Sequence, residues 1–206
     1  MKPQEIVENF GLFKGVVHVG SHYAEERSDY IVAGINKRLW IDANPVIVQN
    51  LAKKIASPND IVICAAVSEN DGEIVKFNVA NNGQSSSILP LKIHAEIYRD
   101  IVYTGYYEMK TVCLSSILNS ENIENSSQYD LINLDIQGVE LRALKGLKDK
   151  LSQFRAVYAE VNTLELYEGC DMMHDLDDFL GNKGFTKIGC KMAGDDGWGD
   201  ALYVRT

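Results

Sequence analysis

The chain has 206 residues, 46% of them hydrophobic and 24% charged, which is the composition of an ordinary globular protein. A net charge of −9, from 29 acidic and 20 basic residues without any basic cluster, argues against nucleic acid as a partner. The longest apolar runs are only as long as strands, so we expect no membrane span. A neutral or cationic small substrate fits this charge better.

The cysteines and the N-terminus bear on the compartment. Cys64, Cys113, Cys170 and Cys190 are scattered, without a C-x-x-C pair, and the first two lie in apolar runs. We therefore expect buried free thiols in a reducing compartment. The first eleven residues lack an apolar core and are not a signal peptide. These features predict a cytoplasmic protein.

In chain order, short apolar runs alternate with amphipathic stretches. We predict helices at residues 3–10, 24–33, 45–55, 139–150 and 171–180. We predict strands at residues 15–19, 38–41, 61–67, 129–134 and 155–161, then a closing pair at 186–190 and 200–205. The run 61–67 is apolar throughout, which is typical of a strand buried on both faces. The pattern predicts one α/β domain over residues 1–206, with an open, mostly parallel sheet.

Residues 73–113 interrupt this alternation. The sequence Asn70-Asp71-Gly72 is a strong hairpin signal before an alternating strand at 73–80. A polar loop at 81–87 follows, then a helical pattern at 91–102 and another strand at 106–113. Polar loops of this kind are functional or mobile. We interpret residues 73–113 as an insertion or lid.

Polar residues follow the ends of the predicted parallel strands, where ligands bind in such sheets. Gly20 makes a turn after the first strand and Asp42 ends the second strand. This arrangement suits a nucleoside, because the acid can accept hydrogen bonds from the ribose hydroxyls. The turn is not the full G-x-G-x-x-G fingerprint, so a structural corner with a solvated Asp42 is the alternative. Asp135, Glu160 and His22 lie at the same predicted edge. A purely structural sheet has no need of that polarity.

Motifs over nearly the whole chain from Gly15 resemble those of the FkbM family of S-adenosylmethionine-dependent O-methyltransferases. The most specific is D-I-Q-G-V-E-L-x-x-L-K-G at residues 135–146. The others are HVGSHYAEE, WIDANP, CAAVSENDGE, GQSSSIL, YAEVNTLELYEG and GDALYVR. The resemblance implies a class I methyltransferase fold, in which a Rossmann-like sheet of seven strands has helices on both faces and its last strand antiparallel.

The resemblance also implies S-adenosylmethionine as cofactor, bound at the first two strand ends. Asp42 would hold the ribose hydroxyls, and Glu25 matches the acid that closes the family's glycine-rich motif. The other implied contacts are His18, Gly20, Ser21, His22, Ala43, Ala66, Val67, Ser86 and Asp135. Two residues depart from the family pattern, since His18 replaces a common acid and Ala24 replaces the motif's last glycine.

Methyl transfer to a hydroxyl is helped by a base that accepts its proton. The candidates are Asp135, Glu160 and His22, with Asp135 first because it follows the central strand and precedes a glycine-containing turn. Asp135 could instead cap the helix at 139–150, and Glu160 could instead hold a substrate hydroxyl. Asp135 and Glu160 could also bind Mg²⁺. Two acids are too few to argue a metal from spacing, so magnesium is possible but not expected.

The implied acceptor is a hydroxyl of a sugar, in a glycan or a glycosylated small molecule. We expect the insertion to set its specificity, because Tyr103, Tyr106 and Tyr107 suit stacking against a sugar, although they suit a lid core equally well. Trp198 is interpreted as a hairpin anchor in preference to part of the acceptor wall. His94 and His174 are interpreted as packing or surface residues, although His94 could reach the site.

Two other functions stay open. An oxidoreductase using NAD or a nucleotide sugar would also place an acid after the second strand, but G-x-G-x-x-G and a Tyr-x-x-x-Lys pair are lacking. The second open function is a non-catalytic binding module. In that case His18 and Ala24 would mark a cofactor site that has been lost. The oligomeric state is not predicted.

Overall fold

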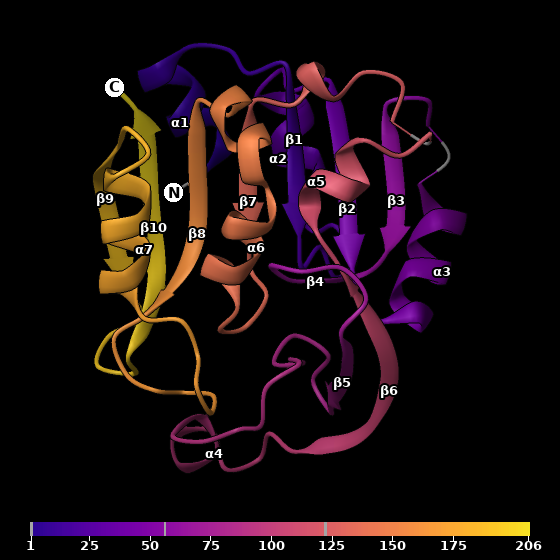
Figure 1. Ribbon diagram of the computed structural model, residues 1–206, viewed down its shortest axis with the longest axis vertical. Coiled ribbons are helices and arrows are strands. Elements are labelled where there is room, and N and C mark those ends of the chain that lie inside the picture. The colour runs from indigo at the N-terminus through magenta and orange to yellow at the C-terminus, as the bar shows by residue number, and fades with distance from the viewer. Residues whose placement is uncertain (1, 56, 122) are drawn as a thin grey trace.

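The computed structural model describes residues 2–55, 57–121 and 123–206. A seven-stranded sheet has the order β3-β2-β1-β7-β8-β10-β9 (Figure 1). Its strands are β1 (Gly15–Val19), β2 (Lys37–Asp42), β3 (Asp60–Cys64), β7 (Leu131–Leu134), β8 (Ala156–Asn162), β9 (Phe185–Met192) and β10 (Trp198–Arg205). The first five in spatial order are parallel, and β10, the last strand of the chain, is antiparallel to both its neighbours. The predicted fold class is confirmed.

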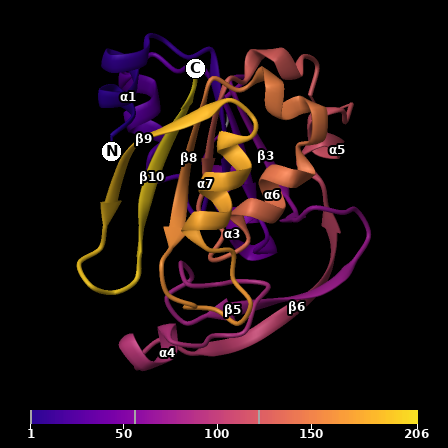
Figure 2. The ribbon, with the colours of Figure 1, turned by 60° about the vertical axis from the view of Figure 1, so that its left-hand side comes forward.

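Helices cover both faces of this sheet (Figure 2). Helices α1 (Pro3–Phe10), α2 (Arg27–Val32) and α3 (Pro45–Lys54) contribute to one core cluster, which contains Val16 and Trp40. Helices α5 (Leu114–Leu118), α6 (Glu140–Gly146) and α7 (Met173–Gly181) contribute to the other, which contains Val17 and Leu39. Successive strand residues point to opposite faces, which divides neighbours such as Val16 and Val17 between the two clusters. Short 3₁₀ helices lie at Ser126–Gln128 and Lys148–Gln153.

The starts of α3 and α2 show one correct and one wrong prediction. The Asn44 side chain accepts hydrogen bonds from the backbone N–H groups of Val46 and Ile47, at 3.0 and 3.4 Å, so Asn44 caps α3 as predicted. Helix α2 begins at Arg27, not at residue 24. Ala24 lies before it with φ of +55°, a conformation that favours glycine. The alanine at this family glycine position is therefore not the mild change expected of a residue already in a helix.

The third predicted strand is shorter and less buried than expected. Strand β3 ends at Cys64, and Ala66–Val67 forms the separate strand β4. Because β3 is the edge of the large sheet, Ile61 and Ile63 are only half-buried and Cys64 is exposed. A continuous apolar run thus did not mean burial on both faces. Cys113 and Cys170 are buried, Cys190 is exposed, and all four thiols are free.

The insertion and the preceding strand β4 form a second sheet beyond the carboxyl ends of the parallel strands (Figure 1). Its order is β4-β6-β5, with β5 (Ile74–Ala80) antiparallel and β4 parallel to β6 (Tyr103–Val112). The turn at residues 70–72 therefore does not join a β4–β5 hairpin, because both strands pair with β6. The helix predicted at 91–102 is wrong beyond the single turn of α4 (His94–Ile97). In the described residues, no helix is long and apolar enough to cross a membrane.

Candidate active site

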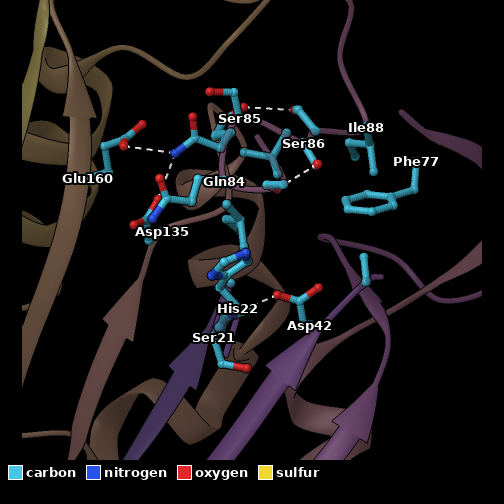
Figure 3. Close-up of a pocket in the computed structure, with 18 of the residues that line it drawn as sticks. Ser21, His22, Asp42, Phe77, Gln84, Ser85, Ser86, Ile88, Asp135 and Glu160 are labelled. Atoms are coloured by element: carbon cyan, nitrogen blue, oxygen red, sulfur yellow. Dashed lines mark hydrogen bonds between the residues drawn. The ribbon is translucent and has the colours of Figure 1, made fainter. Parts of the chain in front are cut away.

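A cavity of about 460 Å³ lies where the carboxyl ends of β1, β2, β7 and β8 meet the insertion. Every residue predicted to form the site lines it: His18, Gly20, Ser21, His22, Glu25, Asp42, Ala43, Ala66, Val67, Ser86, Asp135 and Glu160. Figure 3 shows Asp135 and Glu160 on one side, Phe77 on the other, and His22 and Asp42 between them. The structure thus brings these residues together, and their individual roles stay predictions.

The turn after β1 is tied to the end of β2. The backbone N–H groups of Gly20 and Ser21 donate to the Ile41 carbonyl at 2.8 and 3.0 Å. The next N–H, that of His22, donates to Asp42 Oδ2 at 2.8 Å (Figure 3). The His22 ring is paired with Glu25, with 2.7 Å between Nδ1 and Oε1. These bonds fix the position of Asp42 relative to the turn.

Asp42 is buried, and each of its carboxylate oxygens accepts one backbone hydrogen bond. Oδ1 accepts from the Asn44 N–H at 2.8 Å, as Oδ2 does from His22. Burial raises the pKa of Asp42, while these two bonds oppose the increase. A carboxylate oxygen has two lone pairs, so each oxygen can still accept a hydrogen bond from a ligand hydroxyl. Beside Asp42 the cavity wall is apolar, formed by Ile41, Ala43, Ala65, Ala66, Val67 and Phe77.

His18, which replaces a common family acid, is held within the protein. Its Nδ1 lies 3.3 Å from the Tyr30 hydroxyl and its Nε2 lies 3.5 Å from Asn133 Nδ2. The ring also packs on Trp40, with 5.4 Å between ring centroids. Burial lowers the pKa of His18 to about 3, so the imidazole is neutral near pH 7. It therefore brings no negative charge to the cavity.

Gln137 joins the two acids at the ends of β7 and β8. Its Nε2 donates to Asp135 Oδ1 at 2.7 Å and to Glu160 Oε2 at 2.9 Å, and its Oε1 accepts from the Tyr167 hydroxyl at 2.6 Å. Burial raises the pKa of Asp135 to about 6, against the effect of the Gln137 bond. Burial and the Asp135 charge hold the pKa of Glu160 well above its usual range. The pair can therefore hold a proton near neutral pH.

Glu140 supports the turn between Asp135 and α6. Its fully buried carboxylate accepts from the backbone N–H groups of Ile136, at 2.9 Å, and Gly138, at 3.1 Å. Burial raises the pKa of Glu140 to about 8. The alternative in which Asp135 caps this helix is wrong, because Val139 holds the cap position of α6 and the N–H of Arg142 in its first turn donates to Asp171 Oδ2 at 3.1 Å. Gln137 and Glu140 were not predicted as site residues, although both belong to the most specific motif.

The other residues singled out in the sequence lie partly in the cavity wall and partly outside it. The Ser86 hydroxyl donates to the Gly83 carbonyl at 2.7 Å, so it serves within its own loop. His94 and Trp198 line the cavity, the latter against its interpretation as a hairpin anchor alone. Tyr106 is exposed and, like Tyr107, is not part of the cavity wall. His174 is a surface residue, with 75% of its side chain exposed.

The described residues contain no group of three or more histidine, cysteine or acidic side chains arranged to hold a metal ion. At the two candidate magnesium ligands, Asp135 and Glu160, the Gln137 amide donates to an oxygen of each. A cation bridging those same oxygens would have to displace this amide.

The sheet order, the antiparallel final strand and a cavity at the carboxyl strand ends define a class I methyltransferase. Residues 16–187 match the Methyltransferase FkbM domain family. The chain therefore belongs to the FkbM family of S-adenosylmethionine-dependent methyltransferases, as the motifs indicated. One curated relative is the 2-O-methyltransferase NoeI of Sinorhizobium fredii (strain NGR234), 30% identical over 102 residues. That match covers 50% of this chain and 39% of the relative, so less than half of NoeI is represented.

Solved structures show the same fold at low identity. TrmK of M. capricolum, in complex with S-adenosylhomocysteine, has a TM-score of 0.53 at 9% identity, over 98% of this chain and 66% of its own. The magnesium protoporphyrin IX methyltransferase of Synechocystis PCC 6803, also with S-adenosylhomocysteine, has a TM-score of 0.53 at 11% identity, over 98% and 78%. At such identities the likeness concerns the fold alone.

Proposed function

We propose that this chain transfers a methyl group from S-adenosylmethionine to a hydroxyl of a sugar. The proposal rests on one observation. Gln137 joins the acids Asp135 and Glu160, and this pair lies in the same cavity as Asp42. One end of this cavity suits a nucleoside, and the other suits the proton chemistry of a hydroxyl. The single-domain organisation over 1–206 and a cytoplasmic location stay predictions.

The residues present fit the cofactor. Asp42 has one free lone pair on each oxygen for a ribose diol, and an apolar wall containing Ala66, Val67 and Phe77 lies beside it for the adenine. When bound, S-adenosylmethionine supplies an electrophilic methyl group on a positively charged sulfur. The described lining includes no lysine or arginine, and its acids are Glu25, Glu26, Asp42, Asp135 and Glu160. This charge stabilises a bound cation.

Asp135 is the proposed acceptor of the hydroxyl proton. Gln137 occupies one position on Oδ1, which leaves the rest of the carboxylate to a ligand. A base with a pKa of about 6 is ionised at neutral pH yet still binds a proton well. Glu160 would hold the acceptor hydroxyl next to it. His22 is a further candidate base, since the pairing of its Nδ1 with Glu25 leaves Nε2 to accept a proton.

Transfer to a hydroxyl is supported by the name of the relative NoeI, a 2-O-methyltransferase. An uncharged sugar as the acceptor is compatible with the absence of basic residues from the described lining. The experiment is to incubate the chain with S-adenosylmethionine and a panel of glycans and glycosides, and to measure S-adenosylhomocysteine and methylated product. Product that depends on Asp135 supports the proposal. If S-adenosylmethionine binds but no hydroxyl compound is methylated, the acceptor class is wrong. If only NAD raises the melting temperature, the oxidoreductase alternative replaces it.

A further inference from the structure

Aromatic residues from two distant parts of the chain join to form one wall of the cavity. His94 and Tyr98 come from the insertion, and Trp198 begins β10. Trp198 Nε1 donates to the Tyr98 hydroxyl at 2.9 Å, which in turn donates to Asp196 at 2.5 Å. These bonds tie the turn between β9 and β10 to the insertion. The wall therefore has a fixed arrangement before any ligand enters.

His94 is a buried polar side chain without a protein partner. It is 6% exposed, and its ring lies between those of Tyr98 and Tyr167, with centroids 4.9 and 5.3 Å away. Within the described chain its Nδ1 has no hydrogen-bond partner, an arrangement that costs free energy. Burial lowers its pKa, so the ring is neutral and can both donate and accept. Because His94 lines the cavity, a hydroxyl of a bound ligand can supply the missing hydrogen-bond partner.

The wall adjoins the acids that would hold and activate an acceptor hydroxyl. In the ladder between β8 and β10, Asp200 lies opposite Glu160 and Trp198 lies opposite Asn162. Trp198 is thus on the same face as Glu160, two residue pairs further along the ladder. Both amide atoms of the buried Asn162 also lack a protein partner in the described structure. Asn162 at the end of β8 and His94 in the insertion are therefore both buried with polar atoms that have no partner in the described residues.

The charge around the cavity restricts what can bind there. No lysine or arginine is among its described lining residues, whereas five carboxylates are. A carboxylate or phosphate on an acceptor would therefore have no basic side chain of the described lining to pair with, and it would meet Asp135 and Glu160. An uncharged ring bearing hydroxyls meets no such penalty.

We infer that His94, Tyr98 and Trp198 form the acceptor subsite, and that this subsite takes an uncharged sugar ring and rejects sugar acids and sugar phosphates. The apolar face of the ring packs on Trp198 and Tyr98, and one hydroxyl bonds to His94. This assignment rests on the proposed methyl transfer, because it places the acceptor beside Asp135 and Glu160.

The test uses the full chain saturated with S-adenosylhomocysteine, with sugar binding followed by saturation-transfer NMR. The probes are the methyl pyranosides of glucose, galactose, mannose and fucose, together with glucuronic and galacturonic acids. We expect at least one neutral glycoside to bind, and each acid to bind at least about tenfold more weakly than that glycoside. Trp198→Ala and the shape-conserving His94→Phe should each weaken binding by about tenfold or more. Tyr106→Ala is the matched control, an exposed aromatic residue of the same insertion outside the cavity.

The outcomes separate this inference from the proposed function. If S-adenosylhomocysteine does not bind to the wild type, the proposed function itself fails. If S-adenosylhomocysteine binds equally to wild type and variants, the cofactor site is intact in all of them, and the sugar-binding data then test the acceptor subsite. Acids that bind as tightly as neutral glycosides, no binding of any neutral glycoside, or His94→Phe and Trp198→Ala indistinguishable from Tyr106→Ala would each overturn the subsite. His94→Phe keeps the ring volume, so it remains informative if Trp198→Ala does not fold.

Discussion

Gly20 packs directly against the backbone of Asp135. A Cβ atom placed on Gly20 would lie 1.7 Å from the Asp135 carbonyl oxygen, and Gly20 has φ of +81°. The turn after β1 and the end of β7 therefore touch through main chain alone. This contact places the turn expected to bind the cofactor next to Asp135, the residue proposed as the base.

Gly20→Ala should destabilise the chain strongly, because the new methyl group meets backbone that cannot rotate away. Gly72→Ala is the matched control, since Gly72 has a similar φ of +84° and nothing within 4 Å of the added Cβ. We expect about 1 kcal/mol for Gly72→Ala, from the conformation alone, and at least about 3 kcal/mol for Gly20→Ala. Urea unfolding measures both. Equal losses would show that the contact with Asp135 is unimportant.

His18 makes stability depend on pH in acid. Its pKa is about 3 in the folded chain and 6.5 when exposed, so between these values the unfolded chain binds one proton more. Stability contributed through His18 is therefore lost as pH falls from 6.5 toward 3. Relative to wild type, His18→Asn should gain about 1.4 kcal/mol for each pH unit below 6.5, and nothing above it. Denaturant unfolding at pH 7.5, 6, 5 and 4 tests this. A difference that does not change with pH would contradict it.

Methyl transfer should depend on the ionisation of the acid pair. Because burial raises the pKa of Asp135 to about 6, kcat/KM should rise with pH through that region and then level off. The apparent value belongs to Asp135 and Glu160 together. Asp135→Asn should lower kcat by about 10²- to 10⁴-fold while S-adenosylhomocysteine binding is retained. A rate unchanged in the variant would remove Asp135 from the chemistry.

Gln137 is proposed as a positioning residue that holds the two acids. Its φ is +56°, a conformation that asparagine tolerates, so Gln137→Asn shortens the side chain with little backbone strain. Losing the amide bond to Asp135 removes an interaction that lowers the pKa of that carboxyl. The acid limb of the pH–rate profile should therefore move to higher pH. A purely structural role would lower activity equally at all pH values.

The sheet and the strand-end residues could be predicted because each depends on local sequence. Gly20, Asp42, Asp135 and Glu160 each follow an apolar run, and parallel strands bring such positions to one edge. The class of fold then determines which residues face the cavity.

What could not be predicted depends on packing between distant segments. The pattern at 91–102 looks helical, yet only His94–Ile97 is helical. That His94 and Trp198 share a wall follows from the bond between Trp198 and Tyr98, which no local pattern indicates. The burial of Glu140 was equally hidden, since glutamate is rarely buried without partners and its partners here are backbone N–H groups.

The most direct test of the account is calorimetric titration with S-adenosylhomocysteine. We predict saturable binding at one site in the wild type, and affinity lowered by about tenfold or more in Asp42→Ala, which loses the acceptor for the ribose hydroxyls. Asp178→Ala, which removes an exposed carboxylate on α7, controls for the change in charge and should bind like the wild type. No heat and no thermal shift in the wild type would contradict the account. Equal affinity in Asp42→Ala would support the cofactor assignment but contradict the role of Asp42 in binding its ribose.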